Sequence, residues 1–170
     1  KYKCGDHIIP QGEECSAGTI VIPRGTEVTS TVQTILTGLG RTEITVNAMP
    51  RVLVLTSGHE VIEPGESLTP GKIYNSNRAM ICGLLEDLGF HKITHYHVSD
   101  APEELESEIN HVLKLSEEAD IIISSGGVSV GLFDTMPLIY EKLGAQSIYA
   151  RIQMRPGAAS YGAVTPKGQI

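Results

Sequence analysis

The sequence predicts an α/β fold of three layers (α/β/α), in which helices cover both faces of a mostly parallel sheet. Two observations lead to this prediction. From about residue 50 onward, short apolar segments rich in β-branched residues alternate with segments of helical periodicity. The connections between the apolar segments are long enough for the crossovers that parallel strands require. Hydrophobic residues make up 41% of the 170 residues, which is sufficient for a normal core.

Residues 1–49 are predicted to form a separate unit before this fold. It contains two short strand-like segments and a helix that Thr29 or Ser30 caps, at 19–22, 42–46 and 30–39. The unit has too few apolar residues for a core of its own. We therefore interpret it as a small β-rich fragment of an adjoining domain, and residues 50–170 as the main domain.

Four strands are expected in the main domain. They are short apolar or alternating segments, at 51–56, 93–98, 121–123 and 147–154. The segment 121–123 consists of isoleucines alone and is predicted to be buried on both faces, as in a parallel sheet. Residues 161–165 are expected to form one arm of a hairpin, with residues 166–168 as its turn.

Three helices are expected between these strands. They begin at the capping residues Asn75 or Ser76, Asp100, and Asp134. The first helix ends before Gly89, and its apolar face is expected to consist of Ile81, Leu84, Leu85 and Leu88. The helix that begins at Asp134 ends at Gly144. Strands and helices that alternate in this way form βαβ units.

The third strand leads directly into a glycine turn, Ser124-Ser125-Gly126-Gly127, before the helix at Asp134. Two adjacent glycines let the backbone turn sharply and approach a ligand closely. A strand, a glycine turn and a helix start form a place where backbone N–H groups bind an anion. An ordinary tight turn between a strand and a helix has the same pattern.

Three carboxylates follow three of the predicted strands, namely Glu60, Asp100 and Asp134. Because the carboxyl ends of parallel strands meet at one edge of a sheet, we expect these side chains around one crevice. Together with Ser129 and the amides of 126–127, they would offer oxygen ligands for magnesium that bridges a phosphate. The alternatives are that Asp100 and Asp134 only cap helices and that Glu60 is a solvated loop residue.

His95 and His97 stand at alternate positions of the second predicted strand and therefore share a face. A pair of this kind could bind zinc, but no third ligand stands at a recognisable spacing. Packing against a helix is the favoured interpretation. His59 adjoins the proposed site at Glu60.

Charge and cysteine content exclude several classes of protein. The net charge of −7 argues against a nucleic-acid-binding surface, which requires a basic patch. The cysteines, Cys4, Cys15 and Cys82, form neither a metal-binding spacing nor an even set of disulfides, which favours a reducing, cytoplasmic location. No apolar segment is long enough to span a membrane. We expect the chain to be a piece of a longer protein.

The segment from Ser124 to Asp134, Ser-Ser-Gly-Gly-Val-Ser-Val-Gly-x-x-Asp, resembles the molybdopterin-binding domain of the molybdopterin molybdenumtransferases, the MoeA and gephyrin E-domain family. Other segments agree in order. Residues 56–60 are similar to the family's Ser-Thr-Gly-Asp-Glu, and residues 5–26 to the segment that leads into this domain. Weaker matches lie at 73–77, 98–102 and 155–157. Related adenylyltransferases usually have Gly-Gly-Thr-Gly where this chain has Gly-Gly-Val-Ser.

The resemblance implies the molybdopterin-binding fold and a role in molybdenum cofactor biosynthesis. A transferase of this family binds adenylylated molybdopterin and, with magnesium and molybdate, inserts molybdenum. By this resemblance, the catalytic and metal-binding residues are Glu60, Asp100 and Asp134. The residues expected to bind the cofactor are Ser57, Gly58, Ser125, Gly126, Gly127, Val128, Ser129, Gly131, Pro156 and Gly157.

The expected partner is this small-molecule ligand, with no nucleic acid and no membrane, and the full-length parent is expected to be a homodimer. Four positions depart from the family pattern. His59 and Asn75 each replace an aspartate, and residues 158–159 are Ala-Ala where the family usually has Lys-Pro. The last change removes a positive charge from a site for anions. The alternative is therefore a non-catalytic molybdopterin-binding or sensing module, or a divergent paralogue; an interaction scaffold, as in gephyrin, is a weaker third possibility.

Overall fold

The computed structural model describes residues 2–126 and 135–168. The chain divides into two compact units, Lys1–Asn47 and Ala48–Ile170, and each is described here by itself. No helix in the described ranges has both the length and the apolar character that crossing a membrane requires.

In residues 2–47 the first unit contains one helix, α1 (Ser30–Gly38). The side chain of Thr29 accepts a hydrogen bond from the Val32 amide at 3.4 Å, which confirms the predicted cap. The strands expected at 19–22 and 42–46 are wrong, because the described part of this unit contains no strand. Neither segment has a partner to complete a ladder, and alternation of apolar residues alone does not form a strand. The expectation of a β-rich fragment fails with them.

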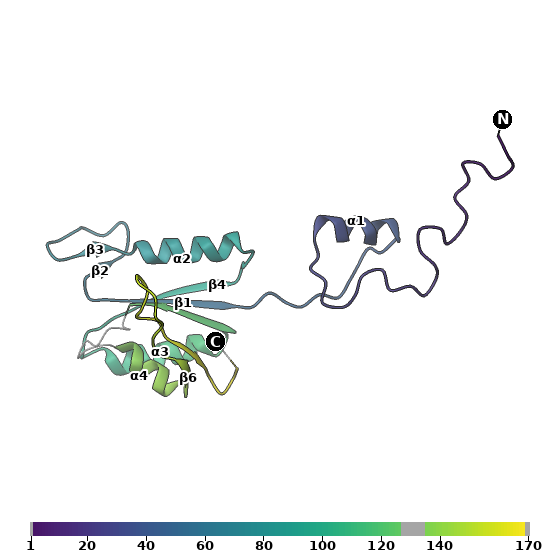
Figure 1. Cartoon of the computed structure of the whole chain (residues 1–170). Helices are drawn as coiled ribbons and strands as arrows, with labels where there is room; N and C mark the ends of the chain where they lie inside the picture. The colour runs from purple at the N-terminus through teal and green to yellow at the C-terminus, as the bar shows by residue number, and fades with distance from the viewer. Residues whose placement is uncertain (1, 127–134, 169–170) are drawn as a thin grey trace. The chain divides into compact units, whose positions relative to one another are not determined.

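The second unit is built on a parallel sheet of β1 (Val52–Ser57), β4 (Ile93–Val98) and β5 (Ile121–Ser125) (Figure 1). The strand order is β4-β1-β5, so β1 lies in the centre. In the register of the sheet, Thr56 of β1 pairs with His97 of β4. The predicted α/β class with a mostly parallel sheet is confirmed.

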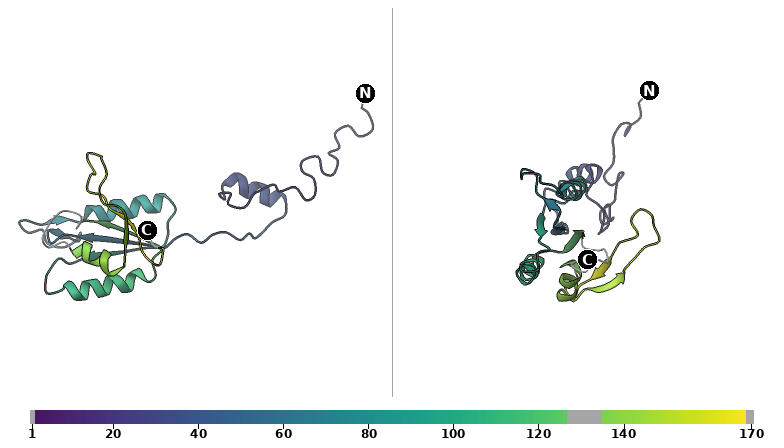
Figure 2. Two further views of the ribbon diagram at one scale, coloured as in Figure 1. Left: turned by 60° about the horizontal axis from the view of Figure 1, so that its bottom comes forward. Right: turned by 90° about the vertical axis from the view of Figure 1, so that its left-hand side faces the viewer.

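Helices cover both faces of this sheet, as Figures 1 and 2 show. Helix α2 (Ser76–Asp87) lies on one face, while α3 (Leu105–Ser116) and α4 (Thr135–Lys142) lie on the other. The Asn75 side chain accepts from the Arg78 amide at 3.1 Å, which confirms Asn75 as the cap of α2.

Side chains of β1 alternate between two hydrophobic cores, as the period of a strand requires. Val52 and Val54 pack with Leu85 of α2. Leu53 and Leu55 pack in the core on the other face, with Val98, Val112, Ala119, Met136 and Ile139. β1 is therefore buried along its whole length.

Strand β5 packs on both faces, as predicted for residues 121–123, but its residues are half-buried rather than fully buried. Ile122 contacts the core of α3 and α4, whereas Ile121 and Ile123 contact the core under α2. β5 pairs with β1 on one side and is the last strand of the described sheet on the other, which leaves it partly exposed.

The apolar face of α2 is narrower than predicted. Ile81, Cys82 and Leu85 contact the core, where Cys82 packs as a small hydrophobic residue. Leu84 and Leu88, expected on the same face, are 58% and 71% exposed. Only the side of the helix nearest the sheet packs against the core, and Leu84 and Leu88 face outward.

Helix α3 begins later than predicted. Its first residue is Leu105 and its N-cap is Glu104, which forms no side-chain cap bond. A turn precedes it, closed by the Glu104 amide and the Ala101 carbonyl at 3.0 Å. Asp100 is therefore not the cap of α3, because this turn separates it from the helix.

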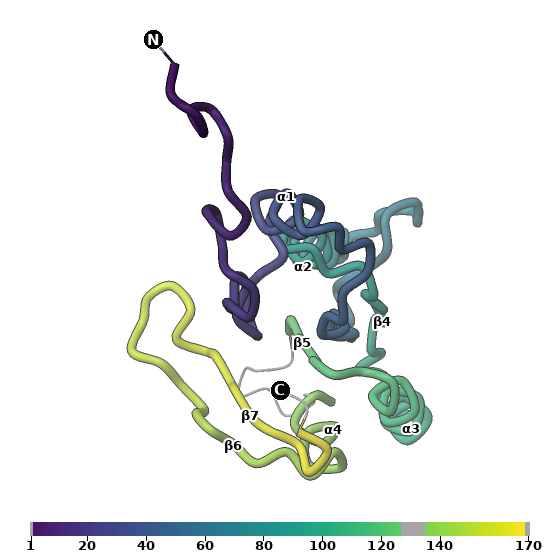
Figure 3. The backbone as a smooth tube through the Cα atoms, turned by 90° about the vertical axis from the view of Figure 1, so that its right-hand side faces the viewer, coloured from purple at the N-terminus to yellow at the C-terminus, as the bar shows by residue number. Residues whose placement is uncertain are grey.

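Two small two-stranded sheets complete the unit. β2 (Val61–Ile62) pairs in parallel with β3 (Ile73–Tyr74). β6 (Gln146–Tyr149) pairs antiparallel with β7 (Gly162–Val164), and Figure 3 shows this ribbon beside α4. The strand expected at 147–154 is therefore shorter than predicted. The predicted turn after β7 is confirmed, since the Gly168 amide donates to the Thr165 carbonyl at 2.8 Å.

Candidate functional site

The carboxyl ends of β1 and β4 border an open cavity of about 450 Å³. Its walls come from the loop after β1, from the start of β2, from the residue before β3, and from the end of β4 with the turn that follows. The described residues that line it are Gly58, His59, Val61, Lys72, His97, Ser99, Asp100, Ala101 and Pro102. Two residues predicted for the site, Gly58 and Asp100, therefore line the same cavity.

Asp100 is half-buried at the end of β4. It does not cap α3, which removes the structural alternative for this residue. Among the described residues, none forms a hydrogen bond or an ion pair with its carboxylate. The carboxylate is therefore available to a metal ion or a ligand.

Glu60 lies close to Gly58 in the loop after β1. Gly58 has a φ of +137°, a conformation that favours glycine, and a Cβ there would lie 3.0 Å from Oε2 of Glu60. The same oxygen lies 3.5 Å from Nδ1 of His59; the His59 side chain is largely exposed and that of Glu60 is about half-exposed. Glu60 is not among the residues that line the cavity.

Ser57 is the last residue of β1 and lies against Gly126. Its Oγ is buried and has no hydrogen-bond partner among the described residues. Gly126 has a φ of +96°, and a Cβ there would lie 2.5 Å from the Ser57 carbonyl oxygen and 2.9 Å from Oγ. The structure therefore brings the start of the glycine turn against the end of β1. The predicted close approach of this turn to a ligand stays a prediction.

Ser125 connects the end of β5 to the start of α2. Its Oγ accepts a hydrogen bond from Nδ2 of Asn77 at 2.8 Å. The motif at residues 73–77 and the glycine turn, which are far apart in sequence, therefore meet at the carboxyl edge of the sheet.

Other predicted site residues are not placed with this group. Five of them lie outside the described residues: Gly127, Val128, Ser129, Gly131 and Asp134. Pro156 and Gly157 are exposed in the loop between β6 and β7. The nearest atom to a Cβ at Gly157 would be Cε of Met154, at 2.6 Å, and neither residue lines the cavity. In the part of the chain that the structure describes, no three His, Cys, Asp or Glu side chains form a metal site.

Sequence reasoning missed Lys72 and gave His97 no role in the site. Both line the cavity. The Lys72 ammonium donates to the carbonyl of His59, which holds the side chain at the cavity. The available signals were weak: Lys72 directly precedes the motif at 73–77, and His97 lies three residues before Asp100.

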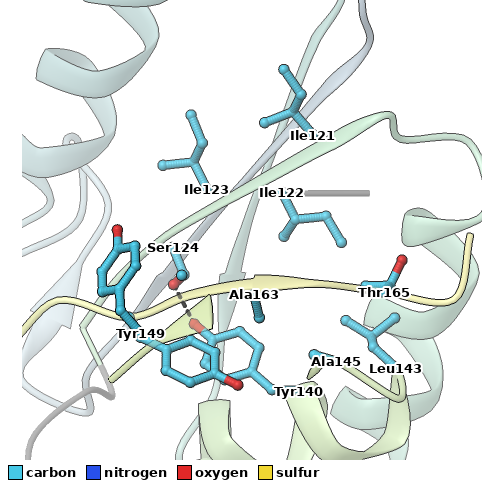
Figure 4. A pocket seen from close by; sticks show the side chains of 12 residues that line it. Ile121, Ile122, Ile123, Ser124, Tyr140, Leu143, Ala145, Tyr149, Ala163 and Thr165 are labelled. Carbon is cyan, nitrogen blue, oxygen red and sulfur yellow. Dashed lines mark hydrogen bonds between the residues drawn. The ribbon is translucent and has the colours of Figure 1, made fainter. Parts of the chain in front are cut away.

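A second cavity, of about 300 Å³, lies between β5 and the ribbon of β6 and β7 (Figure 4). Its wall is largely apolar, with Ile121–Ile123 on one side. The hydroxyls of Ser124 and Tyr140 form a hydrogen bond there, and the Tyr140 ring stacks on Tyr161 at 5.1 Å. None of the residues predicted for the site lines this cavity.

Residues 53–169 match the family model described as a probable molybdopterin binding domain. The chain belongs to this molybdopterin-binding family. This confirms the family that the glycine turn and the accompanying motifs predict.

Curated relatives of this molybdopterin-binding chain are named molybdopterin molybdenumtransferase. The relative from Bacillus subtilis (strain 168) is 34% identical over 160 residues, which cover 94% of this chain and 36% of the relative. A relative from Staphylococcus epidermidis is 38% identical over 159 residues, covering 94% of this chain and 37% of the relative. The chain thus spans little more than a third of the length of these relatives.

A solved structure supports the fold of the molybdopterin-binding family. The molybdopterin biosynthesis MoeA protein from Pyrococcus horikosii superposes with a TM-score of 0.70 at 24% identity. The superposition covers 92% of this chain and 38% of that protein. At this identity the likeness establishes the fold alone.

Proposed function

We propose that this chain is the molybdopterin-binding part of a molybdopterin molybdenumtransferase. It binds adenylylated molybdopterin at the carboxyl edge of the sheet, where magnesium and molybdate allow removal of the adenylate and insertion of molybdenum. The family membership supports the class of ligand. The observation that carries the proposal is the cavity at the ends of β1 and β4, which Gly58 and Asp100 both line.

The available oxygen atoms suit magnesium. Asp100 offers a carboxylate without a described partner, and Glu60 offers a second one from the loop after β1. Magnesium prefers such ligands and usually completes its shell with water and substrate phosphates. In the proposed site, these two side chains hold the metal, together with Asp134 from outside the described residues.

The end of β1 suits a ligand that approaches closely. The buried Ser57 hydroxyl has no hydrogen-bond partner among the described residues. A buried hydroxyl without a hydrogen bond costs free energy, which a ligand that bonds to it would recover. Gly126 lies directly against Ser57, since a Cβ at residue 126 would stand 2.9 Å from the Ser57 Oγ, so the hydroxyl and the start of the glycine turn lie together. In the proposal, the Ser57 hydroxyl and the glycine-turn amides bind polar groups of the pterin and its phosphate.

One observation favours a second candidate, a module that binds molybdopterin without catalysis. Ala158 and Ala159 stand in the exposed loop after Pro156 and Gly157, where a lysine is usual in the family. Their side chains provide no positive charge for an anionic substrate. A module of this kind retains the cavity and binds its ligand but inserts no molybdenum.

The deciding experiment is a calorimetric titration of the 170-residue chain with adenylylated molybdopterin, with and without magnesium. We expect magnesium-dependent binding that Asp100→Asn weakens by about tenfold or more, because a metal ligand is lost. Asp87→Asn, at the exposed end of α2, removes the same charge away from the cavity and is the matched control. Equal binding by both variants would contradict the proposed site.

Catalysis is tested separately, by assaying molybdenum insertion with the protein expressed from its complete reading frame. Binding with insertion supports the transferase. Binding without insertion supports the non-catalytic module. No binding to adenylylated molybdopterin by the 170-residue chain or by the complete protein would overturn both candidates.

A further inference from the structure

Thr56 is the centre of a hydrogen-bond network on the α2 side of the sheet. Its Oγ1 lies 3.0 Å from Nε2 of His95 and 3.1 Å from Nδ1 of His97. Nδ2 of Asn75 donates to the same oxygen at 2.9 Å. Thr56 and Asn75 are each 3% exposed, so the hydroxyl depends on these three partners.

The network continues to an ion pair at the start of α2. Asn75 also donates from Nδ2 to Oε1 of Glu63 at 2.8 Å, and Oε2 of Glu63 lies 2.6 Å from Nη1 of Arg78. Because Oδ1 of Asn75 accepts from the Arg78 amide, the orientation of the amide group is determined. Burial raises the pKa of Glu63, but the hydrogen bonds from Asn75 and Arg78 outweigh it and lower the pKa overall.

The number of hydrogen bonds that the Thr56 hydroxyl can form limits the protonation of His95 and His97. A hydroxyl donates one hydrogen bond and accepts two. Since Asn75 uses one acceptor position, one hydrogen and one lone pair remain for the two imidazoles. One of the two contacting nitrogens must therefore carry a proton, and the other must be bare. The intact network accommodates a single imidazolium.

His95 is the histidine that stays neutral. Burial lowers its pKa most strongly, and the positive charges of Arg78 and His97 lower it further, against an opposing contribution from Glu63. A neutral His95 with a bare Nε2 accepts the Thr56 hydroxyl. Nδ1 of His97 then donates to Thr56, and this arrangement satisfies the hydroxyl completely.

His97 differs from His95 because it also lines the cavity at the ends of β1 and β4. Its Nδ1 is engaged by Thr56, which leaves Nε2 as the only ring nitrogen available to a ligand. Lys72 and His59 line the same cavity, and Asp100 is the carboxylate among its described lining residues. Groups that can carry positive charge thus outnumber the carboxylate in this wall, which favours an anion beside a metal ion.

We propose that His97 is a ligand-contacting residue of this cavity, which donates from Nε2–H to a phosphate group of the bound ligand while Thr56 holds its Nδ1. That the ligand binds in this cavity rests on the proposed function. The hydrogen bonds around Thr56 are observed independently of that function. The anion stabilises the imidazolium of His97, and the neutral His95 accepts the Thr56 hydroxyl in that state. Thr56 is a positioning residue, since it acts on the ligand only through His97.

The test is long-range ¹H–¹⁵N NMR of the imidazoles in the 170-residue chain, with inorganic pyrophosphate as the probe. We expect both His97 nitrogens to become protonated as pyrophosphate is added, while His95 keeps a bare Nε2. His91, at the other end of the sheet, is the reference and should not change. An unchanged His97 at saturating pyrophosphate, or the absence of pyrophosphate binding, would overturn the proposal.

Two variants test the role of His97 by their affinity for adenylylated molybdopterin. His97→Asn keeps a polar atom near the position of Nδ1 for Thr56 but removes Nε2, and should weaken binding by about tenfold. His95→Gln keeps a polar atom near the position of Nε2 and should bind within about twofold of the wild type. If both bind as the wild type does, His97 makes no contact and the proposed function stands. If His97 responds to pyrophosphate but the wild type does not bind adenylylated molybdopterin, the proposed function fails and the anion contact stands.

Discussion

Gly126 lies so close to Ser57 that a Cβ at residue 126 would stand 2.5 Å from the Ser57 carbonyl oxygen. Ser57 is the last residue of β1 and Gly126 directly follows β5, so the contact joins the carboxyl ends of these two neighbouring strands. It requires glycine for two reasons, the positive φ and the lack of space, and the two can be separated experimentally.

Gly126→Ala should destabilise the protein more than Gly71→Ala. Both glycines have positive φ, +96° and +83°, but no atom lies within 4 Å of a Cβ at Gly71. The backbone penalty of about 1–2 kcal/mol is therefore common to both variants. The clash with Ser57 should add about 1–3 kcal/mol, as overpacking does. Urea unfolding measures both, and equal losses would mean that the backbone at Ser57 moves aside freely.

Ser57→Ala should leave the stability of the ligand-free protein unchanged or raise it slightly, because the buried Oγ has no described partner to lose. Ser116→Ala is the matched control. Its Oγ donates to the Leu113 carbonyl at 2.6 Å, so its removal should cost about 1 kcal/mol. Thermal unfolding compares the two variants. A loss at Ser57 as large as that at Ser116 would show that the Ser57 hydroxyl is already satisfied without ligand.

Leu85→Ala should cost about 2–4 kcal/mol of unfolding free energy, because Leu85 is 8% exposed in the core between α2 and β1. Leu84→Ala, one residue earlier, makes the same chemical change at a side chain that is 58% exposed. Its cost should stay below about 0.5 kcal/mol. Chemical denaturation of the two variants checks the burial directly, and a reversed order would mean that α2 is rotated about its axis.

Tyr96→Phe should remove a stabilisation of the fold that is present at neutral pH and is lost at alkaline pH. Burial, followed by the hydrogen bond to Glu108 at 3.0 Å, raises the pKa of Tyr96 to about 12. A phenol with a raised pKa stabilises the fold below its ordinary value of about 10, and this contribution is lost as the pH rises toward 12. Because the side chain is partly exposed, we expect about 1–2 kcal/mol.

The measurement is the difference in unfolding free energy between wild type and Tyr96→Phe from pH 8 to about 11.5. The difference should be constant near pH 8 and decrease above about pH 10. Tyr2→Phe serves as the control, because Tyr2 is 87% exposed in the other unit. A difference that does not change with pH would show that the tyrosine ionises equally in the folded and unfolded chains.

The main elements of the fold could be predicted because each has a local cause. β4 begins and ends at the predicted residues, since a short alternating segment is flanked by turn residues on both sides. The start of α2 follows from Asn75, whose side chain bonds within the first turn. The strands predicted at 19–22 and 42–46 are wrong because a strand depends on a partner strand, which no local sequence pattern supplies.

The candidate site could be predicted only in part, because contacts across the sheet depend on register and loop paths. Motif positions were sufficient to place Gly58 and Asp100 at one edge. The network of Thr56, His95 and His97 requires knowledge of which strands are neighbours, which the sequence does not state. The expected homodimer, cytoplasmic location and domain boundary at residue 50 stay predictions.

The network around Thr56 also bears on how β1 aligns with β4. Apolar side chains cover both faces of β1, so displacement by one residue would exchange valines for leucines at little hydrophobic cost. Thr56 breaks this near-equivalence, because its donors and acceptors all lie on the α2 side. A displaced strand would turn its hydroxyl into the opposite core and leave the Asn75 amide with one partner fewer. The same hydroxyl that contacts His97 thus favours the observed register of β1 and β4 over the displaced one.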